Sequence, residues 1–200
     1  AFTTIWWTTR NRIVRYNTDW TVDATFTTNV WTWPNSWAID IKQLSDWKLV
    51  LWWAFTTFNW TASQRVIILN TDWTIATAVA SWFSSWQVNS VAIDWSDNIY
   101  CWWTFTSYAW NTRQRLAKLW STLVIDATFS CDCNNTVNSV FINWTEIIVS
   151  WSFTTAKTIS VWTIVAVDST NWDVTNDCFW WFFDASWTTE ITNSSNYWYI

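Results

Sequence analysis

The chain has 200 residues, with 26 Trp, no Gly, no His and a net charge of −5 at pH 7. Its acidic balance, with only 10 Lys and Arg residues, disfavours nucleic acid as a partner, because phosphate binding needs a basic surface. The absence of His excludes Ser-His-Asp and Cys-His catalysis. Together with the lack of a Cys-x-x-Cys pair, it argues against a zinc site of the ordinary type. No run of about 18 apolar residues predicts a membrane span.

The first predicted strands, residues 12–17 and 22–26, flank the tetrapeptide Asn17-Thr18-Asp19-Trp20, which returns at Asn70–Trp73. Asp-Gly and Asn-Gly favour hairpin turns, because the second residue often needs φ > 0, where Trp is costly. We therefore interpret most Trp residues as systematic replacements of Gly. We expect several of these to lie at exposed turn tips with positive φ: Trp20, Trp47, Trp60, Trp73, Trp144 and Trp172. We expect Trp52-Trp53 and Trp102-Trp103 to lie where crowded backbones leave little room for an indole.

A Phe-Thr pair marks an internal repeat of about 50 residues, at Phe2, Phe55, Phe105 and Phe153. In the third copy the pattern predicts four strands, at residues 90–94, 98–104, 115–119 and 123–129. Four short strands per repeat of this length are typical of a propeller blade. The predicted fold class is therefore all-β, a β-propeller-like array of four repeats. Ile67, Ala117 and Val165 should lie in equivalent strands.

The repeats predict one domain over residues 1–200, with approximate units 1–33, 34–86, 87–136 and 137–183. Residues 184–200 open a further unit, and residues 1–5 align with the continuation of the same strand. Two arrangements follow, a closed four-blade ring whose ends meet or a window cut from a larger propeller. The second is favoured, because a propeller does not usually close within a strand.

Two segments carry a family resemblance when Trp is read as Gly. Residues 46–56, Asp-Trp-Lys-Leu-Val-Leu-Trp-Trp-Ala-Phe-Thr, supply the first half of the pattern, and residues 12–26 supply the second. These segments resemble the delta-60 repeat of bacterial secreted and surface proteins and phage virion proteins. The resemblance implies a β-propeller-type fold, and it brings no catalytic motif.

Arg12, Arg65 and Arg115 occupy one equivalent position in three repeats. They are candidate residues for binding an anionic ligand, although hydrogen bonding to their own blade is the favoured interpretation. Asp168, Asn171 and Asp173 are a weak calcium candidate, because oxygen ligands alternate there. The same residues align with the ordinary hairpin turns, which favours a plain turn.

Asp23 and Asp126 are equivalent, and a recurrent Asp after a turn usually caps or braces that turn. The chain has four cysteines. Cys131 and Cys133 are too close in sequence for a normal disulfide with each other. Either one of them bridges Cys178 or all four thiols, Cys101 included, are unpaired.

The predicted function is a non-catalytic structural or binding module on an extracellular or virion surface, such as a phage tail or fibre or a bacterial surface protein. Its expected partner is a glycan or a protein within a larger assembly, and no cofactor is expected. Exposed indoles can serve as carbohydrate platforms, but their periodicity at turns argues against that role. The alternative is a propeller-type glycan-active enzyme, which would need two carboxylates about 5–9 Å apart.

Overall fold

The computed structural model describes residues 4–5, 8–9, 13–30, 34–36, 38–79, 83–85, 87–144, 146–152, 154–156, 159–160, 164–170, 173–176, 192–194 and 197–199. Over these residues the fold is mostly β and is built from several small antiparallel sheets. The chain divides into two compact units, residues 1–82 and 83–200, which are described separately.

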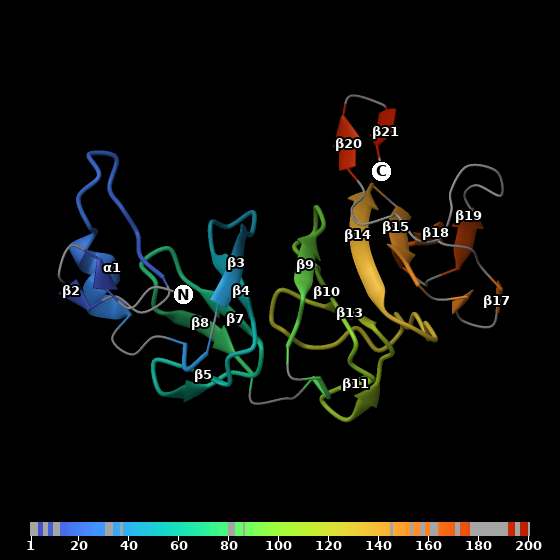
Figure 1. Cartoon of the computed structure of the whole chain (residues 1–200), viewed down its shortest axis with the longest axis horizontal. Helices are drawn as coiled ribbons and strands as arrows, with labels where there is room; N and C mark the ends of the chain where they lie inside the picture. The colour runs from blue at the N-terminus through green and yellow to red at the C-terminus, as the bar shows by residue number, and fades with distance from the viewer. Residues whose placement is uncertain are drawn as a thin grey trace. The chain divides into compact units, whose positions relative to one another are not determined.

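Unit 1 contains a four-stranded antiparallel sheet in which each strand pairs with its neighbours in order (Figure 1). Its strands are β3 (Ala38–Gln43), β4 (Leu49–Trp53), β7 (Val66–Leu69) and β8 (Ile75–Ala78). A small hairpin of β5 (Thr57–Phe58) and β6 (Thr61–Ala62) separates β4 from β7. The preceding repeat contributes β1 (Thr4–Ile5), β2 (Thr8–Thr9), a bridge between Tyr16 and Val22, and the helix α1 (Ala24–Asn29).

Unit 2 repeats this meander twice. The first copy has β9 (Ser90–Ile93), β10 (Ile99–Trp102) and β13 (Leu116–Leu119), with the small hairpin β11 (Ser107–Tyr108) and β12 (Asn111–Thr112). The second has β14 (Val137–Asn143), β15 (Glu146–Trp151), β18 (Ile164–Asp168) and β19 (Val174–Asn176), with the small hairpin β16 (Thr155–Ala156) and β17 (Ile159–Ser160). A separate hairpin follows, β20 (Thr192–Ser194) and β21 (Tyr197–Tyr199).

The pairing register confirms the repeat. Ile67 of β7 lies opposite Leu51, Ala117 of β13 lies opposite Cys101, and Val165 of β18 lies opposite Val149. The third strand of each sheet therefore pairs with the second in the same way in three successive copies. This arrangement is consistent with a propeller-like fold. The number of blades and the closure of the ring stay predictions, and Ala1 and Ile200 lie outside the described residues.

The prediction that each repeat ends in a fourth strand is wrong for the first and third repeats. Residues 24–29 form α1, because Oδ1 of Asp23 accepts a hydrogen bond from the Phe26 amide at 3.0 Å and so caps the helix, while Phe26 is buried. Within residues 123–129 only Ile125 pairs, through an isolated bridge to Leu119. In both segments an Asp side chain accepts a hydrogen bond from a backbone amide, Asp23 from Phe26 and Asp126 from Thr128, where a strand would bond to its neighbour.

The hairpin turns explain the unusual tryptophans. In the turns that end at Trp20, Trp47 and Trp73, the amide of the fourth residue bonds the carbonyl of the first, and φ at the Trp is 66°, 68° and 70°. This is the left-handed position that normally favours Gly. Trp20 and Trp47 are exposed, as expected, whereas Trp73 is buried against Phe26. Trp172 lies outside the described residues.

The small hairpins use a second kind of turn. Both central residues are left-handed, with φ of 46° and 63° at Asn59-Trp60 and 48° and 68° at Ala109-Trp110. Such a pair is the hairpin turn that favours Asn-Gly. Trp60 and Trp110 are exposed by 85% and 98%. Several tryptophans therefore do occupy glycine-like backbone positions at turn tips.

The prediction of crowding at the Trp doublets is wrong for Trp52 and Trp102. Both indoles are buried, and Nε1 of Trp102 donates a hydrogen bond to the Asn138 carbonyl at 3.1 Å. These residues lie within strands, where alternate side chains point into the core, so an indole fills space there. The core of unit 1 also includes Leu51, Phe55 and Ile67.

The Phe-Thr markers anchor the loop that precedes each repeat. Phe55 and Phe105 are buried, and the amides that follow them donate to one side chain of that loop. Three loop residues make these paired contacts: Asn35 with Thr56 and Thr57 (2.8 and 3.1 Å), Ser84 with Thr106 and Ser107 (2.7 and 3.0 Å), and Asn134 with Thr154 and Thr155 (3.0 and 3.3 Å).

Candidate binding surface

Two exposed indoles stack on each other in unit 2. Trp95 lies in the turn between β9 and β10, and Trp144 lies in the turn between β14 and β15. Their ring centroids are 4.9 Å apart, the ring planes differ by 22°, and the residues are 70% and 73% exposed. Both turns join the first two strands of a repeat, so the fold brings equivalent positions of consecutive repeats together.

The two tryptophans differ in their backbones. Trp144 has φ of 47°, whereas Trp95 is not among the described residues with positive φ. In the turn of Trp95 the left-handed residue is Asp97, with φ of 61°. The interpretation that Trp replaces Gly therefore accounts for Trp144 and leaves Trp95 without an explanation.

The chain around this indole pair is acidic. Asp94 and Asp97 lie in the turn of Trp95, Glu146 follows the turn of Trp144, and neither of the segments 94–97 and 143–146 contains Lys or Arg. Asp94 organises its turn, since Oδ1 accepts from the Ser96 and Asn98 amides at 2.9 Å and Oδ2 accepts from the Tyr100 hydroxyl at 3.1 Å. Burial, followed by the charge of Asp94, raises the pKa of the Tyr100 hydroxyl, which stays a donor. This surface suits a neutral or cationic ligand better than an anion.

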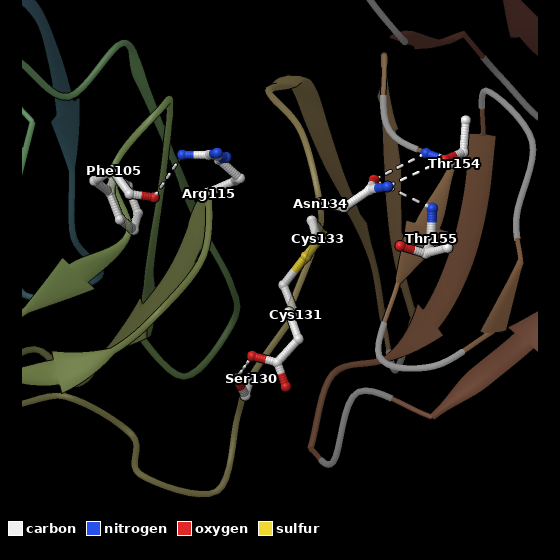
Figure 2. The surroundings of a disulfide bond; sticks show 9 residues. Phe105, Arg115, Ser130, Cys131, Cys133, Asn134, Thr154 and Thr155 are labelled. Atoms are coloured by element: carbon white, nitrogen blue, oxygen red, sulfur yellow. Dashed lines mark hydrogen bonds between the residues drawn. A yellow bond between two sulfur atoms is a disulfide. The ribbon is translucent and has the colours of Figure 1, made fainter.

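The described arginine candidates contact their own repeats. Arg65 donates through Nη1 to the carbonyls of Ala54 (3.0 Å) and Phe55 (3.2 Å). Arg115 donates in the same way to Thr104 and, at 3.5 Å, to Phe105, as Figure 2 shows in part. Burial lowers the pKa of Arg65. Arg12 lies outside the described residues, so a shared anion-binding role for the three arginines stays a prediction.

The calcium candidate is a turn in the part that the structure describes. Oδ1 of Asp168 accepts from the amide of Thr170 at 2.7 Å and from its hydroxyl, and the Asp168 amide donates to the Asp173 carbonyl at 2.8 Å. Asn171 is not described. Among the described residues, no group of three or more Asp, Glu, Cys or His side chains is placed to hold a metal ion.

Asp23 and Asp126 brace their turns, as expected. Asp23 caps α1 and pairs with Arg15, and the hydrogen bond from Phe26 followed by that from Arg15 lowers its pKa. Asp126 accepts from the Thr128 amide at 2.9 Å and lies 3.3 Å from Nζ of Lys118. Burial alone would raise the pKa of Asp126, but its hydrogen bonds from Thr128 and Lys118 outweigh burial and lower it.

The cysteine prediction is wrong for one pair. Cys131 and Cys133 form a disulfide with each other, with Cα atoms 5.2 Å apart (Figure 2). The intervening Asp132 adopts φ of 46°, a reversal that brings the two side chains to one side of the chain. Both cysteines are buried in the core of unit 2. Cys101 is a buried free thiol whose pKa is raised by burial, and Cys178 lies outside the described residues.

The stacking of Trp95 on Trp144 was not predicted from the sequence. The useful signal is the repeat itself, because the two residues occupy the same turn of successive copies, about one repeat apart. Their stacking depends on how adjacent sheets pack, which no local motif specifies.

Comparison with known proteins identifies one family match. Residues 1–26 match the model of a domain of unknown function, the DUF5122 beta-propeller. No curated protein and no solved structure matches the chain. No helix within the described ranges is long and apolar enough to cross a membrane. Together with the antiparallel meanders, the match over residues 1–26 supports a propeller-type family for this chain.

Proposed function

We propose that the chain is a non-catalytic binding module of the delta-60 repeat type, displayed on an extracellular or virion surface. In this proposal a bacterial surface protein or a phage tail or fibre carries it, and Trp95 and Trp144 bind a neutral glycan. The observation that carries the proposal is the exposed stacked pair, with rings 4.9 Å apart. Trp95 is central because no backbone requirement for Gly accounts for its position.

The chemistry of the pair suits a sugar ring. An indole offers a large flat apolar face on which the apolar face of a sugar ring can be buried. The carboxylates of Asp97 and Glu146, close in sequence to the indoles, can accept hydrogen bonds from sugar hydroxyls. Sulfated or sialylated glycans should bind less well, because the two segments carry acidic and no basic residues.

The test is binding of the purified chain to an array of neutral and acidic glycans, followed by affinity measurement on the best neutral glycan. Trp95→Ala and Trp144→Ala should each weaken binding about tenfold or more, the equivalent of about 1.4 kcal/mol. Trp110→Ala is the matched control, because Trp110 is a 98% exposed turn indole of the same unit. It should leave the affinity unchanged.

Three outcomes would overturn the proposal. The intact chain binds no glycan, or all three variants lose affinity equally, or only the acidic glycans bind. Release of free sugar from the bound glycan would favour the alternative, a propeller-type glycan-active enzyme using Asp or Glu. Capture of a protein partner that is insensitive to Trp95→Ala would place recognition elsewhere on the chain.

A further inference from the structure

A buried cation connects two successive repeats in unit 2. Lys118, on β13, lies 3.3 Å from Oδ2 of Asp126 of its own repeat. Its Nζ also donates to the carbonyl of Ser169 at 2.9 Å, and Ser169 belongs to the β18–β19 turn of the next repeat. The rings of Tyr100, Trp120 and Phe129 surround the ammonium at 5.3–5.8 Å.

Unit 1 has the same connection at the equivalent positions. Arg15 pairs with Asp23 of its own repeat and donates to the carbonyl of Thr71 at 3.4 Å. Thr71 is the second residue of the β7–β8 turn, as Ser169 is of the β18–β19 turn. Nδ2 of Asn29 donates to the Asp72 carbonyl of that turn at 2.7 Å, so two side chains of the first repeat hold it.

The second and fourth repeats lack this cation. Lys118 lies opposite Tyr100 in its sheet, and the residues with the same register are Ile68, opposite Val50, and Ala166, opposite Ile148. Neither apolar side chain can donate to a following turn. The basic residue therefore alternates along the chain, in repeats one and three only.

From this alternation we infer that the chain is a tandem of two two-repeat modules, each closed by a cation of its first repeat that binds the last turn of its second. The sequence period is then about two repeats rather than one. The division of the chain into residues 1–82 and 83–200 falls at the junction that has no such cation. Each module should open and unfold as a unit of its own.

The second repeat suggests a test of this inference that should leave the fold of the third repeat intact. Removing one partner of a buried ion pair leaves an uncompensated charge, whereas replacing both with apolar residues is often neutral. The double variant Lys118→Ile with Asp126→Ala gives the third repeat the residues that the second repeat has at Ile68 and Ala76. It should keep the third repeat folded while it loses the bond to Ser169 and, within the third repeat, the bonds of Asp126 to Thr128.

Native-state hydrogen exchange of the full chain measures the result segment by segment. In the double variant, amides of residues 164–170 should exchange at least tenfold faster, with residues 38–79 unchanged. Lys118→Arg, which copies Arg15, should keep protection within threefold. Lys48→Ile with Asp46→Ala is the matched control, because this exposed pair lies within one turn and should change neither unit.

Arg15→Met provides an independent test, since Arg15 is 40% exposed and the buried Asp23 carboxylate keeps its hydrogen bond from the Phe26 amide at 3.0 Å. Residues 70–75 should then lose protection at least tenfold while residues 90–119 keep theirs. Unchanged exchange in both turns would overturn the inference. Equal acceleration across both units, in either variant, would show that the repeats form one cooperative array and would overturn it as well.

Discussion

Replacing Trp60 by Gly should stabilise the chain, contrary to the usual effect of deleting an aromatic side chain. Trp60 sits at the tip of the β5–β6 hairpin with φ of 63°, and its indole is 85% exposed, so little burial is lost with it. A left-handed conformation costs a non-Gly residue about 1–2 kcal/mol. Gly avoids this cost but loses about 0.5–1 kcal/mol through its larger freedom in the unfolded chain.

The net gain expected for Trp60→Gly is therefore about 0.5–1 kcal/mol. Trp60→Ala is the matched control, because Ala removes the indole but keeps the Cβ that disfavours positive φ, so it should change the free energy of unfolding by less than about 0.5 kcal/mol. Trp110, with φ of 68° in the other unit, should respond to Gly as Trp60 does. Trp95→Gly should destabilise, because Trp95 has no positive φ to relieve and stacks on Trp144.

The assay is urea unfolding followed by far-UV circular dichroism, with each variant compared against its own folded and unfolded baselines. Equal stabilisation by Trp60→Ala and Trp60→Gly would show that the indole, rather than the backbone, is the unfavourable element. Destabilisation by Trp60→Gly would refute the estimate of strain and remove the physical argument that these tryptophans occupy glycine positions.

Two further predictions concern hydrogen bonds of the fold. Asn134→Ala should cost about 1 kcal/mol in urea unfolding, because it removes two exposed hydrogen bonds from the amides of Thr154 and Thr155. Asn135→Ala should cost less than half as much, because its Oδ1 accepts from the adjacent Thr136 and its Nδ2 makes only a long bond to the Ser152 carbonyl at 3.4 Å. Asp126 has a lowered pKa when folded, so its stabilising contribution is complete above its unfolded pKa of about 3.9 and is lost as the pH falls through the folded value. The urea midpoint should therefore fall as the pH drops below about 4, and a variant with Asp126→Asn should show a smaller fall, whereas an identical pH profile would contradict the assignment.

The repeat made the strands predictable, and the exceptions have physical causes. Ile67, Ala117 and Val165 lie in equivalent strands because runs of alternating side chains and turn residues recur with one period. Helix α1 was missed because one side chain, Asp23, caps a segment whose sequence closely matches the third-repeat strand prediction. Propensity cannot distinguish those outcomes, because a local side-chain hydrogen bond between the Phe26 amide and Asp23 decides between them.

The candidate surface was harder to predict than the fold. The positive φ of Trp20, Trp47 and Trp60 follows from local turn chemistry and was predicted from Asn and Asp before Trp. The disulfide between Cys131 and Cys133 depends on the left-handed backbone of Asp132, a conformation that no sequence pattern indicates. The stack of Trp95 on Trp144 depends on the packing of two sheets, and only superposition of the repeats could have suggested it.

Each described sheet is built from strands of one repeat, and this local pairing has a kinetic consequence. The sheet from β3 to β8 is complete within residues 38–78, and the sheet from β14 to β19 within residues 137–176. Such local pairing gives a low contact order for a β protein, and low contact order favours fast folding. At about 5–20 residues per second, a ribosome takes roughly 2–8 s to synthesise a segment of this size. Each sheet should therefore form during translation before the next one has emerged, which limits the time for which unpaired strand edges of neighbouring repeats can exchange partners.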